Sequence, residues 1–309
     1  MSRLLIKASN PMCLLQDAGR FGVRHLGVTQ GGAADWLSMT WANWLLGNAP
    51  GAAVVEITLG GMSLIAQSDC TLALAGADLA ASVDGKALKP WRCIELKKGQ
   101  TLSFTQPLLG ARAYLAAPGG FVAPQVLGSS ATVVREQLGG PDSFGRALAI
   151  GDELNYTAEP SALRDIPLAQ HPGFTANPLL DVVLGAQIGA FSGQSTFDAF
   201  NQPWTLDSRA DRMGIRLQGP ALEYQGAPMI SEGIPLGAIQ VPPDGQPIVL
   251  LNDRQTIGGY PRLGALTPLA LARLAQCVPG ETVYLRPVTQ DAAQRQHQAF
   301  MQRFNQPSP

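Results

Sequence analysis

Charged residues are scarce in this 309-residue chain, at 15%, where an average globular protein has about a quarter. The 22 basic and 23 acidic residues nearly cancel and leave a formal net charge of −1. Without an excess of either sign, the chain has no long-range field with which to hold a nucleic-acid backbone or an anionic membrane. We therefore expect neither partner. The apolar share of 46% predicts a large core, an extensive subunit interface, or both.

Long apolar runs, paired cysteines and several familiar motifs are also missing. No stretch reaches the roughly 18 apolar residues of a membrane-spanning helix, and the first 17 residues lack the apolar run of a secretory signal. The four cysteines form no CxxC pair, so we expect buried thiols and a cytoplasmic location. The three histidines are far apart, and we expect no metal site. No P-loop, GxGxxG, GxSxG or biotin-carrier segment occurs.

Short strands separated by turns dominate what is present. Apolar or alternating runs recur at about ten-residue spacing, which is typical of a β-barrel or sandwich. The Asp84-Gly85 pair predicts a two-residue hairpin turn. Predicted strands include Leu4–Lys7, Val54–Leu59, Met62–Ala66, Cys70–Ala75, Leu102–Phe104, Ala113–Ala116, Asp181–Val183, Met213–Leu217 and Pro247–Leu251.

Three helices interrupt this pattern. Asp35 predicts the N-cap of a helix that stops at Gly47 and packs its tryptophans in the core. Thr267-Pro268 predicts the start of a short second helix, and residues 290–304 predict a polar third one. Prolines gather between residues 155 and 181 and indicate a seam. We place the boundary between two β-rich domains, residues 1–165 and 166–309.

The densest polar cluster is the glycine-rich stretch 16–35, QDAGRFGVRHLGVTQGGAAD. Its five glycines flank Asp17, Arg20, Arg24 and His25, and the stretch leads into a helix start. Backbone N–H groups and arginines of this kind hold anions. The alternative is a compact loop with a local Asp17–Arg20 ion pair, and composition alone modestly favours this interpretation. The smaller stretch GSSAT, residues 128–132, is an anion nest or, more simply, a Ser/Thr turn.

Two further polar clusters lie in the second half. DSRADRMGIRLQG, residues 207–219, gathers three arginines before a strand, where a charged strand entry and a binding function are equally good interpretations. Residues 230–264 place Asp253, Arg254 and Gln255 directly after a buried strand, and we favour a functional site there. Asp253 is suited to hold a proton or an ammonium group, and Gln240 and Gln255 to recognise an amide.

Together these segments resemble a known family, the C subunits of bacterial ATP-dependent 5-oxoprolinases, also called KipA-like or allophanate hydrolase subunit 2-like. The chain is also similar to part of the carboxyltransferase region of urea carboxylase. The resemblance runs from about Leu5 to Arg303. It is carried by the sequences QDAGRFGVRHLGVTQGGAAD, ANWLLGN, EITLGG, LAGAD, YLAAPGGF, LGSSAT, DRMGIRLQG and EGIPLGAIQVPPDGQPIVLLNDRQTIGGYPR.

The resemblance implies a mainly β chain with two cyclophilin-like β-barrel domains and a few short helices. It implies a subunit of an enzyme that opens the lactam of 5-oxoproline to L-glutamate, inactive without its partners, a KipI-like B subunit and an A subunit. ATP with Mg²⁺ would be the co-substrate, and no biotin would be attached to this chain. The implied site has Asp17, Asp253 and Gln255 as catalytic residues, and as binding residues Arg20, His25, Arg212, Gln240, Arg254 and Tyr260.

Two other functions stay open at this point. One is a carboxyltransferase-type component of urea or allophanate metabolism, which would need biotin on another chain. The other is a non-catalytic KipA-like regulator that binds a KipI-like protein. A prolyl-isomerase activity suggested by the fold alone is weak, because a fold does not fix a function.

Overall fold

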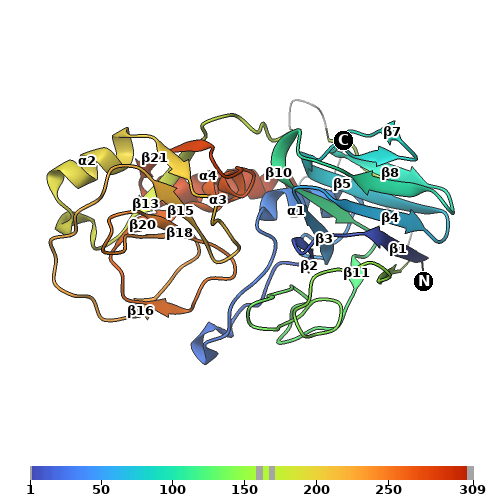
Figure 1. Cartoon of the computed structure of the whole chain (residues 1–309), viewed down its shortest axis with the longest axis horizontal. Coiled ribbons are helices and arrows are strands. Elements are labelled where there is room, and N and C mark those ends of the chain that lie inside the picture. The colour runs from blue at the N-terminus through green and yellow to red at the C-terminus, as the bar shows by residue number, and fades with distance from the viewer. Residues whose placement is uncertain (1, 158–162, 167–170, 305–309) are drawn as a thin grey trace. The chain divides into compact units, whose positions relative to one another are not determined.

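The computed structural model describes residues 2–157, 163–166 and 171–304. They form two compact units (Figure 1). Unit 1 comprises Met1–Phe21 and Gly31–Gly173, and unit 2 comprises Gly22–Gln30 and Phe174–Pro309. The sequence placed the division at 165/166. The structure divides the chain eight residues later and also transfers a short early segment, residues 22–30, to the second unit.

Unit 1 consists of two sheets around one apolar core. The larger sheet has the strand order β11-β12-β1-β4-β9-β6-β7, and the smaller has the order β2-β3-β10-β5-β8. The strands are β1 Ser2–Ala8, β2 Cys13–Gln16, β3 Val54–Thr58, β4 Met62–Ala66, β5 Cys70–Asp78, β6 Ser82–Val83, β7 Lys86–Ala87, β8 Arg92–Leu96, β9 Thr101–Phe104, β10 Leu109–Ala116, β11 Phe121–Val122 and β12 Glu153–Tyr156.

Burial along these strands follows their surroundings. In β4 alternate residues are buried, because only one face of the strand meets the core. All five residues of β3 are buried, since helix α1 (Trp36–Leu45) packs on the other face of that sheet, over β5 and β10. The predicted helix start is confirmed: the Asp35 carboxylate accepts hydrogen bonds from the backbone N–H groups of Leu37 and Ser38.

Unit 2 is built on a closed barrel with the strand order β13-β20-β17-β18-β15-β14-β21. The β13–β21 pair is parallel and the other pairs are antiparallel. Its elements are β13 Leu179–Leu184, η3 Ile188–Ala190, α2 Gly193–Asn201, β14 Trp204–Leu206, β15 Gly214–Gln218, β16 Glu232–Gly233, β17 Ala238–Gln240, β18 Ile248–Leu250, β19 Ile257–Gly258, β20 Arg262–Leu266, α3 Pro268–Leu274, β21 Thr282–Val288 and α4 Gln290–Phe304.

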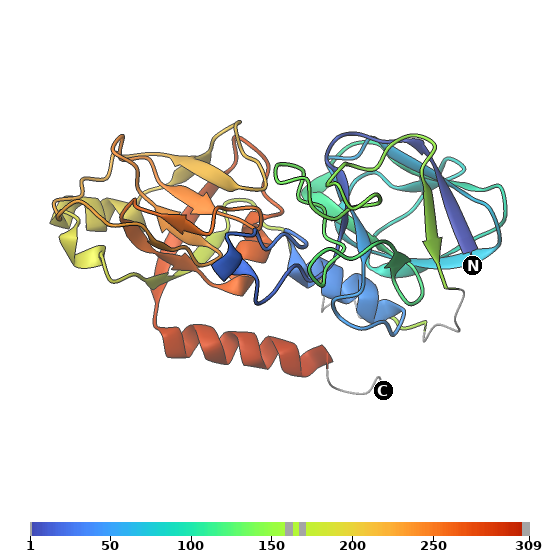
Figure 2. The ribbon, with the colours of Figure 1, turned by 90° about the horizontal axis from the view of Figure 1, so that it is seen from below.

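The early segment adds a 3-10 turn, η1 (Arg24–Leu26), to unit 2. Figure 2 shows this blue turn against the orange strands of the barrel, and α4 as one continuous helix after β21. Strands β16 and β19 form a separate two-stranded ribbon. The expected mainly β architecture is thus confirmed. In the described part of the chain, no helix has the length and apolar character needed to cross a membrane.

Candidate functional site

The glycine-rich stretch 16–35 is divided between the two units. Asp17 and Arg20 lie in unit 1, whereas Arg24 and His25 lie in unit 2 on the η1 turn. The residues of this stretch therefore do not act as one loop within either unit, and each group is described with the unit that holds it.

In unit 1, the Asp17 carboxylate is bound by the segment GSSAT that follows much later in the sequence. The Ser129 hydroxyl donates to Oδ1 at 2.6 Å, and the backbone N–H of Ser130 donates to Oδ2 at 2.7 Å. Oδ1 also accepts from the backbone N–H of Gly19 at 2.7 Å. The anion held by this serine turn is therefore a side chain of the protein itself.

Arg20 donates to backbone carbonyls of the same turn and of the residues just before it. Its Nε donates to the carbonyl of Val126 at 3.0 Å, and its Nη2 donates to that of Ala131 at 2.8 Å. Only 1% of Arg20 is exposed. These contacts give Asp17 and Arg20 a structural function in unit 1, and their predicted roles toward a ligand stay predictions.

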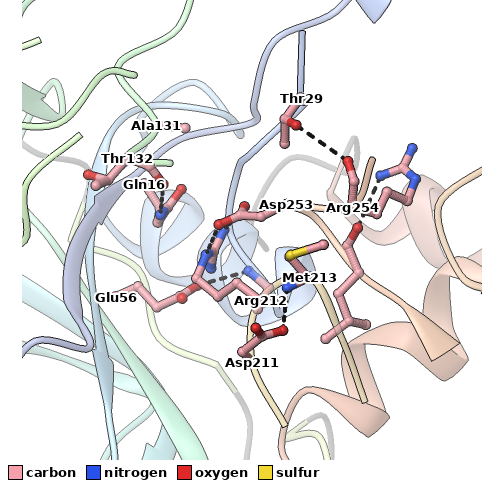
Figure 3. A network of polar contacts seen from close by, with 12 residues as sticks. Gln16, Thr29, Glu56, Ala131, Thr132, Asp211, Arg212, Met213, Asp253 and Arg254 are labelled. Carbon is pink, nitrogen blue, oxygen red and sulfur yellow. Dashed lines mark hydrogen bonds and ion pairs between the residues drawn. The ribbon is translucent and has the colours of Figure 1, made fainter. Parts of the chain in front are cut away.

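In unit 2, Arg212 and Asp253 form a two-pronged ion pair, shown in Figure 3. Arg212 Nε lies 3.0 Å from Oδ2 and its Nη2 lies 3.1 Å from Oδ1. The backbone N–H of Asp253 donates to the carbonyl of Arg212 at 2.8 Å, which fixes the two loops relative to each other. The side chains are 15% and 7% exposed. A parallel fork of this kind orients a carboxylate firmly. The sequence had predicted both residues, from two separate clusters.

Unit 2 also contains a pair of arginines, Arg24 and Arg254, of which only Arg254 was predicted as a site residue. Arg254, 3% exposed, donates through Nε to the carbonyl of Ile234 at 3.1 Å and through Nη1 to that of Leu251 at 3.2 Å. Arg24 donates to the same Ile234 carbonyl and, at 3.0 Å, to that of Thr256. Arg24 stands in the early glycine-rich stretch, but nothing in the sequence signals that it would join a loop some 230 residues later.

The electrostatics of this pair are unusual. Burial, and secondarily the charge of Arg24, lowers the pKa of Arg254 to about 10. Burial also lowers the pKa of Arg24. Two residues of the early segment also bind Arg254. Gln30 Oε1 accepts from Nη2 at 3.4 Å, and the Thr29 hydroxyl donates to the Arg254 carbonyl at 3.4 Å (Figure 3).

Two glutamines lie beside the β16–β19 ribbon. A Cβ built on Gly258 would lie 3.0 Å from Gln240 Nε2, 3.6 Å from Gln255 Nε2 and 2.6 Å from Ile234 Cδ1. Gln240 is 2% exposed, and its Nε2 has no hydrogen-bond partner among the described residues. Gln255 is exposed. The two side-chain amides thus lie beside Gly258, and each carries N–H donors.

The remaining predicted binding residues are more open. Tyr260 is 47% exposed, and His25 on η1 is exposed. Within the described ranges, no hydrogen bond ties either side chain to the arginines. Among the described residues, no group of three or more His, Cys, Asp or Glu side chains is placed to hold a metal ion.

Comparisons with known proteins agree with this architecture. The family model "Carboxyltransferase domain, subdomain A and B" matches residues 26–287. The chain is 39% identical over 284 residues to the C subunit of the 5-oxoprolinase of Haemophilus influenzae, covering 90% of this chain and 89% of that protein. It is 35% identical over 302 residues to the corresponding C subunit of Escherichia coli, covering 94% and 93%.

A solved structure extends the likeness to a larger enzyme. The crystal structure of Kluyveromyces lactis urea carboxylase matches 98% of this chain with a TM-score of 0.91 and 25% identity, but only 29% of that longer chain is covered. The chain therefore belongs to the carboxyltransferase-domain family with subdomains A and B. Its two bacterial relatives are each matched over nearly their whole length.

Proposed function

We propose that this chain is the C subunit of a 5-oxoprolinase, acting with A and B subunits, the latter KipI-like, and with ATP and Mg²⁺. The observation that carries the proposal is the 39% and 35% identity to two proteins named as C subunits of 5-oxoprolinase, each over about nine-tenths of both chains. The name of those relatives implies an assembly of several chains. None of the four cysteines is in a disulfide, which suits the reducing cytoplasm where we place the chain.

The chemistry of lactam opening explains which groups such a site needs. A lactam carbonyl is a poor electrophile. Phosphoryl transfer from ATP to the lactam oxygen releases ADP and activates the carbon. Water then adds to this carbon, and the tetrahedral adduct expels the ring nitrogen as an amine, which breaks the C–N bond and leaves an acyl phosphate. A second water hydrolyses the acyl phosphate to glutamate and phosphate. The site must therefore hold a carboxylate and phosphoryl oxygens with positive donors, and must orient the lactam.

Unit 2 supplies groups of these kinds. We assign Asp253, held by Arg212, and the amide of Gln255 to orienting the lactam, with Gln240, His25 and Tyr260 as further contacts. Arg212 and Arg254 are the proposed anion contacts. The contacts of Asp17 and Arg20 within unit 1 favour a supporting role for both.

The test is a reconstitution of the three chains. Purified A, B and C chains with 5-oxoproline, ATP and Mg²⁺ are expected to release glutamate and ADP, and omission of this chain is expected to abolish the reaction. Asp253→Asn should lower turnover strongly, while the matched control Asp244→Asn, whose carboxylate pairs with Arg216, should not. A soluble assembly of all three chains without turnover would refute the proposal.

A second candidate is a carboxyltransferase acting in urea or allophanate metabolism. It is favoured by the TM-score of 0.91 to urea carboxylase. Consumption of carboxybiotin in the presence of urea, with no glutamate formed from 5-oxoproline, would establish it. A KipA-like regulator would instead bind a KipI-like partner tightly without any nucleotide turnover.

A further inference from the structure

Arg24 and Arg254 stand apart from most arginines of unit 2. Six others have a carboxylate partner within ion-pair distance, namely Arg209, Arg212, Arg216, Arg262, Arg286 and Arg295. Arg24 and Arg254 bind neutral oxygens: four contacts to backbone carbonyls and one to the Gln30 amide. Among the described residues, no carboxylate forms an ion pair with either of them.

This arrangement leaves two positive charges side by side without a counter-charge among the described residues. Both guanidinium groups reach the same carbonyl oxygen, that of Ile234. Burying a charge without an opposite charge is costly, and a like charge next to it adds to that cost. The lowered pKa of Arg254 reflects both effects. An anion bound beside the pair would remove the cost.

Unused donors are available for such an anion. Arg24 employs only Nη2 in its hydrogen bonds, so its Nε–H and both Nη1–H groups bind no described residue. Arg254 makes one bond from each of its three nitrogens and so retains one N–H on Nη1 and one on Nη2. A planar fork of this kind matches the two oxygens of a carboxylate.

A purely structural function explains the pair less well. The bonds of Arg24 to Ile234 and Thr256 do attach the early segment to the barrel of unit 2. One guanidinium would achieve this attachment, whereas the second adds repulsion. The buried Gln240 amide, beside the side chain of the same Ile234, supplies a further neutral donor without a partner among the described residues.

We propose that Arg24 and Arg254 together receive the carboxylate of a small carboxylic acid substrate. This inference rests on the proposed function and deepens it, because it names the two residues that would hold the carboxylate of the substrate. Neutral urea has no group that would neutralise the pair, whereas 5-oxoproline carries one carboxylate. Arg24 thereby becomes a binding residue, contributed to unit 2 by the early segment.

The test measures direct binding to the full-length chain at constant ionic strength. L-5-oxoproline, urea and inorganic phosphate are each titrated into the chain, and isothermal calorimetry measures their binding. Saturable binding of 5-oxoproline alone is expected. Arg24→Met and Arg254→Met should each weaken it by about 30-fold or more, and Arg254→Lys should weaken it less. Arg216→Met, which removes an arginine paired with Asp244, should leave binding unchanged.

Thermal unfolding separates binding from attachment. Arg254→Met removes an uncompensated charge, and the Ile234 carbonyl keeps Arg24 as a donor. The melting temperature of the ligand-free chain is therefore expected to fall much less than that of Arg20→Met. A destabilised Arg254→Met chain with unchanged affinity would show that the pair only attaches the segment. Equal binding of urea, tighter binding of phosphate, or no saturable binding of 5-oxoproline would also overturn the inference.

Failure of this inference is distinguishable from failure of the proposed function. If the three-chain assembly releases glutamate and the KM for 5-oxoproline is unchanged in both methionine variants, the function stands and the carboxylate receptor is wrong. If the acid binds through both arginines but no turnover is found, the receptor stands and the function is wrong.

Discussion

Asp17 and Arg20 hold the same loop by its opposite hydrogen-bonding groups. Asp17 accepts from the Ser129 hydroxyl and the Ser130 N–H, whereas Arg20 donates to the carbonyls of Val126 and Ala131. The two residues are three positions apart in the sequence, yet each forms hydrogen bonds with different groups of one distant turn. Both side chains therefore form their hydrogen bonds within unit 1, and substituting either of them should lower the free energy of unfolding.

Arg20→Met is expected to destabilise the chain by about 3 kcal/mol, because buried carbonyls lose a charged donor. Urea unfolding of the free chain measures this loss. The control is Arg3→Met, which removes an exposed pair with Glu153 and should change the free energy of unfolding by less than about 0.5 kcal/mol. Equal effects of the two changes would contradict the structural role of Arg20.

Gly139→Ala is expected to lower the free energy of unfolding by more than the strain of a positive φ angle alone. Gly139 has a φ of +67°, and an added Cβ would collide with the Ala131 carbonyl and with the Arg20 guanidinium. Gly151 has a φ of +91° but nothing within 4 Å of its Cβ position. Gly151→Ala should therefore cost only about 1 kcal/mol, and Gly139→Ala clearly more. Matched unfolding curves of the two variants decide this.

The Arg212–Asp253 pair is expected to act as one unit in turnover. Because the carboxylate is oriented by the fork, Arg212→Lys should lower turnover even though it keeps the charge. In a double-mutant cycle with Arg212→Met and Asp253→Asn, the double variant should be little worse than either single one, with a coupling of about 1–3 kcal/mol. Steady-state rates of the three-chain assembly provide the measurement. Additive losses would mean that the two residues act separately.

Cys93 is expected to react slowly with alkylating reagents near neutral pH. Burial, with a smaller contribution from the Asp165 charge, raises the pKa of its thiol to about 11. Since only the thiolate is the nucleophile, its alkylation rate should rise about tenfold per pH unit from about pH 7 to about pH 9.5 rather than levelling off near about pH 8.5. Asp165→Asn should lower the pKa and accelerate the reaction. Site-resolved mass spectrometry follows it, and a plateau below about pH 9 would contradict the assignment.

The same shift also has a consequence for folding. The thiol pKa is higher in the folded than in the unfolded chain, so the folded state favours the protonated form. The stability linked to Cys93 is present below the unfolded pKa of about 8.5 and is lost as the pH rises toward about 11. Cys93→Ala should therefore flatten the alkaline decline of the unfolding free energy.

Local signals predicted much of the fold. The N-cap at Asp35, the Thr267-Pro268 start and the C-terminal helix Gln290–Phe304 are all confirmed, and strand β4 has the predicted bounds. The Asp84-Gly85 turn has the positive φ angles, 47° and 79°, of a tight hairpin. Such features are decided by a few neighbouring residues, which is why the sequence alone reveals them.

Helix α2 was missed because its stability comes from elsewhere. Its sequence, GQSTFDAFN, begins with glycine and has a β-branched residue in the first turn, so its intrinsic helix propensity is low. The helix packs on β21, and the Trp204 indole donates to the Ala199 carbonyl at 3.0 Å. Contacts of this type are made only after distant segments meet.

The candidate site shows the same limit. The sequence predicted Arg212 and Asp253 because each stands in a polar cluster beside a buried strand, and the barrel brings those strand ends together. It did not show that Arg20 turns into unit 1 while Arg24, four residues later, belongs to unit 2. Side-chain direction within a glycine-rich loop depends on backbone angles that composition does not determine.

Because residues 22–30 belong to unit 2, the chain cannot be cut into its two units at a single point. Unit 2 is assembled from two separate stretches of chain, so a single cut near residue 173 would produce a barrel fragment that lacks η1, Arg24 and Gln30. Exchanging the barrel between relatives would require a second, short insert near the amino terminus. A hybrid made with one crossover would combine the early segment of one parent with the arginine loop of the other.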